Sequence, residues 1–222
     1  MNHPDRTSAK QGFTLTEVLL SISILSIVHM MASGFLISSM QMNGMTTGKT
    51  LVSRDIRQFT QTFGRDARAA NHMGIYEGIL PNQHNLQENS GETGDLIVFY
   101  YQDFDYQTRK LYVSRVVGYY RVVENARTAE GPVYRFSESG HWDTVDDYLL
   151  PHTSSDVLRS SNSGQELPVR QTVQLTRGLA DGKLFYNYAQ RRAVIVRGEI
   201  DNPGRMGQNA INTYNFTVFP RG

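Results

Sequence analysis

Glu17 is the residue whose position most strongly suggests a function. It lies near the start of a run of apolar and small residues from Phe13 to Met40, in which His29 is the one other ionisable side chain. An α-helix rises about 1.5 Å per residue, so roughly 20 apolar residues cross a bilayer, and this run is long enough to do so. A carboxylate at the edge of a membrane helix is costly, and by default it is interpreted as functional. For His29, two interpretations stay open: a neutral histidine tolerated among small residues, or a hydrogen bond to a neighbouring helix.

Ionisable residues also gather in the second half of the chain. Two groups lie close together in sequence, and they comprise His141, Asp143, Asp146 and Asp147, then His152, Ser154 and Asp156. A catalytic triad is defined by geometry and not by proximity along the chain. The sequence contains no nucleophile elbow, phosphate loop or zinc-protease motif. We therefore interpret both groups as parts of a solvated loop, and we do not expect an enzyme.

Aspartates could also supply oxygen ligands to calcium. The candidate groups are Asp103 with Asp105, and Asp143 with Asp146 and Asp147. Neither group has a recognisable ligand spacing. We expect no cofactor, with a structural calcium as the alternative.

A short polar leader precedes the apolar run. Residues 1–12 carry two basic side chains, and the switch from polar to apolar falls between Gly12 and Phe13. An ordinary secretory signal has its cleavage site after the apolar region, so this leader is of a different kind. The sequence from Lys10 to Glu17, KQGFTLTE, resembles the processing and N-methylation motif of type IV prepilins and pseudopilins.

This resemblance implies a sequence of processing and assembly. A prepilin peptidase would cleave between Gly12 and Phe13 on the cytoplasmic face and then methylate the new amino group of Phe13. The apolar helix would stay in the membrane until the subunit is extracted into a filament. Glu17 then lies one helical turn from a cationic amine, and a paired carboxylate is far less unfavourable in hydrocarbon than a lone one. Glu17 can pair with its own Phe13 amine or with that of a neighbouring subunit, and the second pairing would set the register of assembly.

The overall composition excludes some functions. The chain has 22 basic and 21 acidic residues, so there is no electrostatic case for nucleic-acid binding. It has no cysteine, which excludes a disulfide framework, thiol catalysis and a cysteine-ligated zinc site. Twelve tyrosines and ten phenylalanines suit a β-rich domain.

The helix is expected to continue beyond the membrane segment. Apolar residues recur at steps of three and four and mark one helix face; they are Val52, Ile56, Phe59, Phe63, Ala67 and Ala70. Residues 65–71, RDARAAN, resemble the end of the long helix in J-type pseudopilins and W-type minor pilins. The expected organisation is a leader at 1–12, a transmembrane and assembly helix at 13–40, its amphipathic continuation at 41–71, and a β-rich globular domain at 72–222.

After residue 71 the pattern changes to that of strands. Residues 75–94 read as a loop, and 138–170 and 201–212 are further long loops. The predicted strands are Asp95–Tyr101, Leu111–Val123 (as one strand, or two interrupted near Gly118), Val133–Ser137, Thr172–Leu179, Lys183–Tyr188, Ala193–Ile200 and Thr213–Phe219. Asp181-Gly182 predicts a hairpin between its two flanking strands. A helix followed by consecutive strands predicts an α+β fold, with a long N-terminal helix packed on an antiparallel sheet, as in pilins.

Two functions of different classes are consistent with this sequence. The resemblance favours a minor pilin or pseudopilin, a structural subunit of a type IV pilus or a type II secretion pseudopilus. Its implied partners are other pilin or pseudopilin subunits, the prepilin peptidase, the inner-membrane assembly platform and the membrane. Its implied location is the bacterial inner membrane, with one membrane span and a periplasmic domain, and then the filament. The alternative is a membrane-anchored periplasmic binding module or enzyme that uses a prepilin leader.

Overall fold

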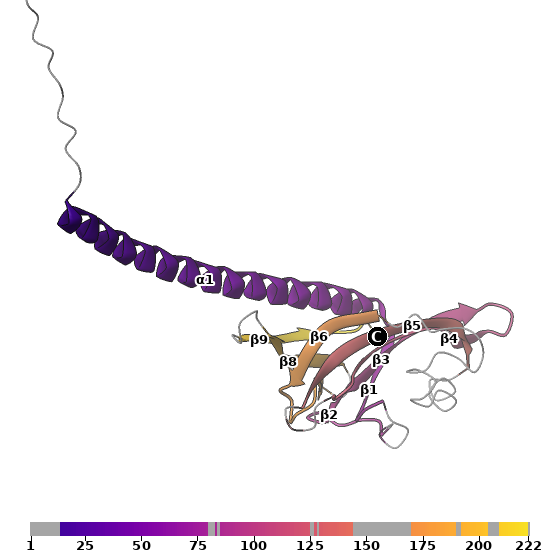
Figure 1. The fold of residues 1–222 in the computed structure, drawn as a ribbon. Coiled ribbons are helices and arrows are strands. Elements are labelled where there is room, and N and C mark those ends of the chain that lie inside the picture. Colours follow the sequence, from indigo (N-terminus) through magenta and orange to yellow (C-terminus); the bar gives the residue numbers. More distant parts are fainter. Residues whose placement is uncertain are drawn as a thin grey trace, which may run out of the picture. The chain divides into compact units, whose positions relative to one another are not determined.

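One long helix followed by an antiparallel sheet makes up the fold. The computed structural model describes residues 14–79, 83, 85–124, 127, 129–143, 170–189, 192–203 and 209–221. In these residues, one α-helix precedes a nine-stranded antiparallel sheet, which is the predicted α+β arrangement (Figure 1). The chain divides into two compact units, and the boundary lies between Gly44 and Met45, inside the helix.

The helix and strands have the following bounds. Helix α1 spans Leu15–Ala69, two residues short of the predicted end. The strands are β1 (His72–Tyr76), β2 (Thr93–Gly94), β3 (Leu96–Asp105), β4 (Lys110–Arg121), β5 (Glu130–Trp142), β6 (Arg170–Gly178), β7 (Phe185–Tyr188), β8 (Ala193–Pro203) and β9 (Asn209–Val218). Pairing follows the order β1-β3-β4-β5-β6-β8-β7-β2, and β9 pairs with β8.

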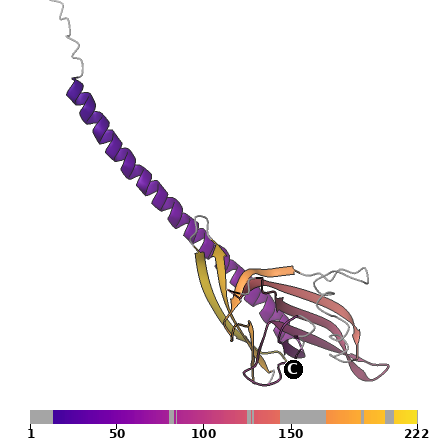
Figure 2. The same ribbon diagram turned by 60° about the horizontal axis from the view of Figure 1, so that its bottom comes forward.

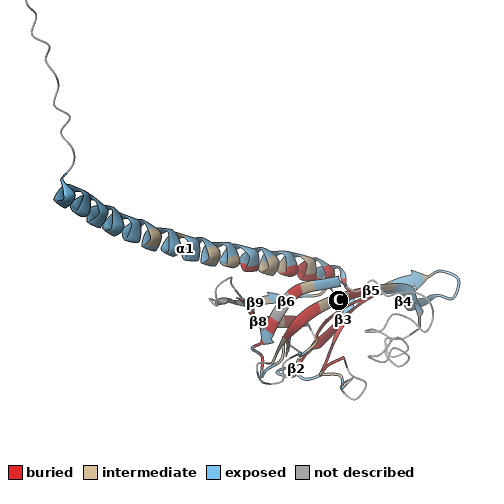
Figure 3. Cartoon of the chain, viewed as in Figure 1, coloured by how far each residue is buried: buried red, intermediate tan, exposed pale blue. Residues whose placement is uncertain are grey.

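Within the second unit, the last part of α1 packs on the sheet through the predicted apolar face (Figures 2 and 3). The buried residues of this part include Val52, Phe59, Phe63 and Ala67, and Ile56 is partly buried. Ala70, which comes directly after the end of α1, is buried too. The Phe63 ring lies 5.2 Å from that of Phe99 and 5.0 Å from that of Tyr119, and it stacks on Phe185 at 5.9 Å. The 3.6-residue period of the sequence therefore correctly identified the face that carries the core.

Strand β3 has a core on each of its two faces. Its first six residues are all buried, as the continuous apolar run predicted. Side chains alternate across a strand, so Ile97 and Phe99 join the cluster under α1. Val98 and Tyr100 join a second cluster on the opposite face, together with Phe136.

The Asp181-Gly182 pair forms a tight turn, as predicted. Both residues have positive φ, 52° and 81°, a backbone conformation that Gly and Asp adopt more readily than most residues. Ala180 and Lys183 exchange two backbone hydrogen bonds of 2.9 Å across the turn.

The hairpin predicted around this turn, with Thr172–Leu179 paired to Lys183–Tyr188, is wrong. Strands β6 and β7 both pair with the same edge of β8, because β9 pairs along its other edge. Strand β6 ends opposite Gly198, and β7 begins opposite Val196. The chain therefore continues in one direction along β8, and the turn is a short excursion from that path.

A buried ion pair holds the excursion in place. The guanidinium of Arg121 donates to both carboxylate oxygens of Asp95, at 3.0 and 2.9 Å, and to the carbonyl of Gly182 at 2.6 Å. The backbone N–H of Leu184 also donates to Asp95, at 3.0 Å. These bonds join residues far apart in sequence, so a local turn signal could not reveal them.

Other strand predictions need smaller corrections. Strand β4 runs through Gly118 without interruption, so the single-strand alternative is correct. The short strand predicted at Val133–Ser137 is the centre of a 13-residue strand, β5. The segment 75–94, predicted as a loop, contains the end of β1 and all of β2. The segment 201–212 contributes residues to β8 and β9, and 138–142 belong to β5.

Gly118 lies against the second cluster, the one that contains Phe136, so a substitution at this position tests how tightly the cluster is packed. Gly118 pairs with Phe136 across β4 and β5, and a Cβ at this position would lie 2.1 Å from the Phe136 ring. We expect Gly118→Ala to destabilise the fold by about 1–3 kcal/mol, because a well-packed core does not accept extra volume. Urea unfolding of the full chain in detergent, followed by near-ultraviolet circular dichroism, measures this change. Phe136→Leu should partly rescue the variant.

Gly44→Ala is the matched control, because no atom lies within 4 Å of the added Cβ and the site is helical. An equal loss of stability in both glycine variants, or no rescue by Phe136→Leu, would refute the steric explanation.

Candidate functional site

Thr14 and Glu17 form a capping box at the start of α1. The backbone N–H of Glu17 lies 3.4 Å from the hydroxyl oxygen of Thr14, and the backbone N–H of Thr14 lies 3.4 Å from Glu17 Oε2. The first backbone N–H groups of a helix lack the acceptor that a preceding turn would supply. The Glu17 N–H also donates to the Thr14 carbonyl at 3.1 Å, and the contact to Glu17 Oε2 partly satisfies the Thr14 N–H. The helix dipole also favours a negative charge in the first turn. The pattern Thr-x-x-Glu before an apolar run could have predicted this box, although the sequence analysis did not identify it.

The motif residues that precede Thr14 lie outside the described residues. Gly12 and Phe13, predicted as the cleavage and N-methylation positions, are both in this group. Thr14 is the first residue that the structure describes, and Glu17 lies within the first turn of α1. The pairing between Glu17 and the Phe13 amine therefore stays a prediction.

The first unit exposes apolar side chains along its whole described length. No residue from Thr14 to Gly44 is buried, and large side chains such as Leu20 and Phe35 are 64% and 73% exposed. By length and composition, α1 is the one helix among the described residues that could cross a membrane, with a window of mean hydropathy 2.0. Because such a surface is unfavourable in water, this part of α1 requires an apolar environment.

Polar side chains in this apolar segment are accommodated by the helix itself. The hydroxyls of Ser21, Ser23 and Ser26 each donate to the carbonyl four residues earlier, at 2.8 Å. Such bonds make serine inexpensive in an apolar helix. His29 is exposed on this helix, and both interpretations of its role stay open.

Asp105, one of the aspartates considered as calcium ligands, takes part in a turn. Asp105 accepts hydrogen bonds from the Thr108 hydroxyl at 2.7 Å and the Gln107 N–H at 2.8 Å, within the turn between β3 and β4. These bonds, the one from Thr108 first, hold the pKa of Asp105 below its usual value. No group of three or more His, Cys, Asp or Glu side chains that could hold a metal ion occurs among the described residues.

The two ionisable groups predicted to lie in a loop are partly described. The His141 ring stacks on that of Tyr112 at a centroid distance of 4.0 Å, at the end of β5. Asp143 is the last residue of the described range 129–143. The other members of the two groups lie outside the described residues, and they are Asp146, Asp147, His152, Ser154 and Asp156.

The end of α1 is joined to the sheet by a buried carboxylate. Asp66 Oδ2 accepts hydrogen bonds from the Tyr119 hydroxyl at 2.6 Å and from Arg135 Nε at 2.8 Å, and the Asp66 carbonyl accepts one from Tyr101 at 2.8 Å. Burial and the bond to Asp66 raise the pKa of Tyr119, which keeps its hydroxyl a donor. Sequence reasoning did not single out Asp66; a lone acidic residue on the otherwise apolar face of the helix was the available signal.

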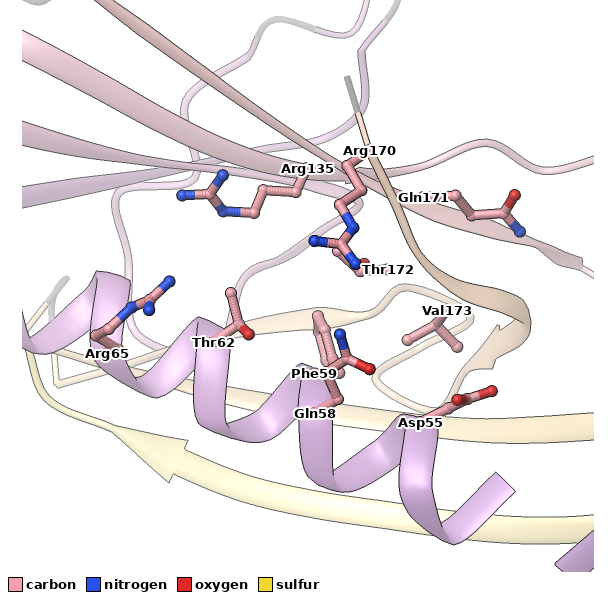
Figure 4. A pocket seen from close by; sticks show the side chains of 10 residues that line it. All are labelled: Asp55, Gln58, Phe59, Thr62, Arg65, Arg135, Arg170, Gln171, Thr172 and Val173. Carbon is pink, nitrogen blue, oxygen red and sulfur yellow. The ribbon is translucent and has the colours of Figure 1, made fainter. Parts of the chain in front are cut away.

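A cavity of about 510 Å³ lies beside this junction, within the second unit (Figure 4). Helix α1 supplies one wall, and strands β5 and β6 supply the other. Three arginines line it: Arg65 from α1, Arg135 from β5 and Arg170 from β6. A cavity with converging polar groups is the feature expected of a binding module, so it bears on the alternative function.

The structure is that of a protein with a long, apolar N-terminal helix followed by an antiparallel sheet. Comparison with known families adds information about the start of that helix. An apolar N-terminal helix that carries a prepilin motif fits membrane anchoring. Residues 7–33 match the family model described as the prokaryotic N-terminal methylation motif. The predicted type IV prepilin leader is therefore confirmed, and it supports a type IV pilin-like or pseudopilin precursor. No curated protein and no solved structure matches the chain.

The Asp66 junction yields a quantitative prediction. Asp66→Asn removes the charge from a nearly buried acceptor of two hydrogen bonds, so we expect a loss of about 2–3 kcal/mol in the free energy of unfolding. Asp55→Asn is the control on the same helix. The Asp55 side chain is 34% exposed and lies 4.0 Å from Arg54, so its loss should cost less than about 0.5 kcal/mol. Urea unfolding of both variants measures the difference, and equal effects would show that Asp66 does not anchor the helix.

Proposed function

We propose that this chain is a minor pilin or pseudopilin, a structural subunit of a type IV pilus or a type II secretion pseudopilus. The observation that carries the proposal is the continuity of the methylation motif with an apolar helix that nothing in the described chain covers. In a filament, the apolar helices of other subunits would supply that cover. Before assembly, the lipid of the inner membrane would do so.

The geometry of the first turn suggests how Glu17 acts. Its contacts to Thr14 are 3.4 Å long, which makes them weak hydrogen bonds. After cleavage between Gly12 and Phe13, a cationic amine would be available one turn away. A charge-assisted bond to the Phe13 amine of a neighbouring subunit would then replace a weak local contact with a stronger one.

The location and partners follow from the same proposal. The chain would reside in the inner membrane with one span and place its sheet unit in the periplasm. The prepilin peptidase and the inner-membrane assembly platform would act on it in turn. A minor subunit fits best, because the mass of 25.1 kDa is large for a major subunit that repeats along a filament. The resemblance of residues 65–71 to the end of the long helix in J-type pseudopilins and W-type minor pilins favours one of these two types.

A second candidate is a membrane-anchored module that binds an anion in the periplasm. The arginine-lined cavity is the specific observation in its favour. The family of the matched motif is structural and not enzymatic, so binding is the form of this alternative that we retain. Incorporation of the chain into a filament distinguishes the two candidates.

Processing is the first test of the proposed function. Protein isolated from its native host should begin with N-methylated Phe13, because the motif directs cleavage after Gly12. N-terminal sequencing and intact mass measure this directly. A chain that still begins with Met1 in a host with active prepilin peptidase would contradict the proposal.

Glu17 is the second test. Glu17→Gln keeps the size of the side chain but removes its charge, so the cleaved subunit should enter filaments at least about tenfold less efficiently. Quantitative immunoblotting of sheared filaments or of cross-linked assemblies measures incorporation. The control Glu124→Gln makes the same change at an exposed position after β4 and should assemble normally. Normal incorporation of Glu17→Gln would refute the role of Glu17 in register.

A further inference from the structure

The cavity between α1 and strands β5 and β6 is built from groups that bind anions. Figure 4 shows the side chain of Arg65 rising from α1 and that of Arg170 extending from β6 into the same space. Thr62 adds a hydroxyl group to the lining, whereas the hydroxyl of Thr172, which also lines it, donates to the carbonyl of Val133 at 3.0 Å. Guanidinium groups present several N–H donors in a planar fork, the geometry that suits a carboxylate or a phosphate.

The charges of the lining are not balanced. Arg135 is paired with Asp66 at 2.8 Å, and Arg65 lies 3.6 Å from the same carboxylate. Among the described residues, the side chain of Arg170 makes no recorded hydrogen bond or ion pair. Among the described lining residues, Asp55 is the one that is acidic, and it lies 4.0 Å from Arg54, which is outside the lining. Within the part of the chain that the structure describes, Arg170 is therefore the arginine of the lining that no carboxylate pairs.

We propose that this cavity binds one carboxylate side chain of a neighbouring protein subunit, held chiefly by Arg170. A single carboxylate would neutralise the charge of Arg170, whereas a phosphate dianion would bring one more negative charge and would also face Asp55. The chemistry of the site follows from the lining residues alone, and the neighbouring subunit as the source of the carboxylate rests on the proposed function.

A binding experiment tests the chemistry of the site. The full chain in detergent is titrated with N-acetylglutamate methylamide, which carries one side-chain carboxylate. The NMR signals of the backbone N–H groups of Gln171 and Thr172, which line the cavity and remain in the Arg170→Gln variant, are followed. The neutral glutamine analogue and inorganic phosphate are the comparison probes. We expect the glutamate probe to bind more tightly than either one. Arg170→Gln should weaken this binding about tenfold, the loss expected for one charge-assisted hydrogen bond.

Arg192→Gln is the matched control, because it makes the same change at an exposed arginine outside the cavity lining. It should bind the glutamate probe with unchanged affinity. The proposal is overturned if the glutamine analogue or phosphate binds as tightly as the glutamate probe. It is also overturned if Arg170→Gln binds the glutamate probe as the unmodified chain does. Unfolding curves of both variants exclude a general loss of structure as the cause.

A cellular experiment tests the source of the carboxylate. Arg170→Glu should lower incorporation into filaments about tenfold, while Arg192→Glu should leave it unchanged, because only the first places two carboxylates against each other. If Arg170→Glu assembles normally although N-methylated Phe13 is found, the neighbouring subunit is not the source and this inference fails by itself. An unprocessed Met1 start would instead refute the proposed function.

Discussion

The aromatic face of α1 is the interaction on which the folded unit depends. The Phe63 ring is fully buried and lies within 6 Å of rings from β3, β4, β7 and β9, which are Phe99, Tyr119, Phe185 and Phe216. These strands come from the beginning, the middle and the end of the sheet unit. Burial of one such side chain contributes on the order of 2–3 kcal/mol. Without the helix, strands β3, β4, β7 and β9 would expose these aromatic rings to water. The helix and the sheet therefore require each other.

The same helix has an opposite requirement before Gly44. There, apolar side chains point in all directions, and none is buried by the described chain. An amphipathic helix presents one apolar stripe to a sheet, whereas a helix that is apolar all round is suited to lipid or to a bundle of like helices. The change from one pattern to the other within α1 thus separates the part that folds with its own chain from the part that requires an apolar environment outside it.

Sequence reasoning succeeded where the deciding contacts are local or periodic. The stripe through Phe59 and Phe63, the buried run of β3 and the turn at Asp181-Gly182 all depend on spacing within a short segment. It failed where a contact between distant segments decides. The flanking strands β6 and β7 do not form a hairpin, because β8 pairs with both and the Asp95–Arg121 pair holds the turn aside. Asp66 was missed for the same reason, since its partners lie 53 and 69 residues further along the chain.

Two carboxylates on α1 show how the number of bonds that a group makes determines what it can do. Asp66 is buried and accepts short bonds from Tyr119 and Arg135, so exchanging either partner would leave a buried polar group unsatisfied. It is suited to fix the helix on the sheet. Glu17 is exposed, and among the described residues its carboxylate makes only contacts of 3.4 Å to Thr14, so replacing them costs little. A carboxylate held this loosely at the start of an apolar helix can accept a cation from outside its own chain, which is the property that the proposed assembly through this end of the helix would require.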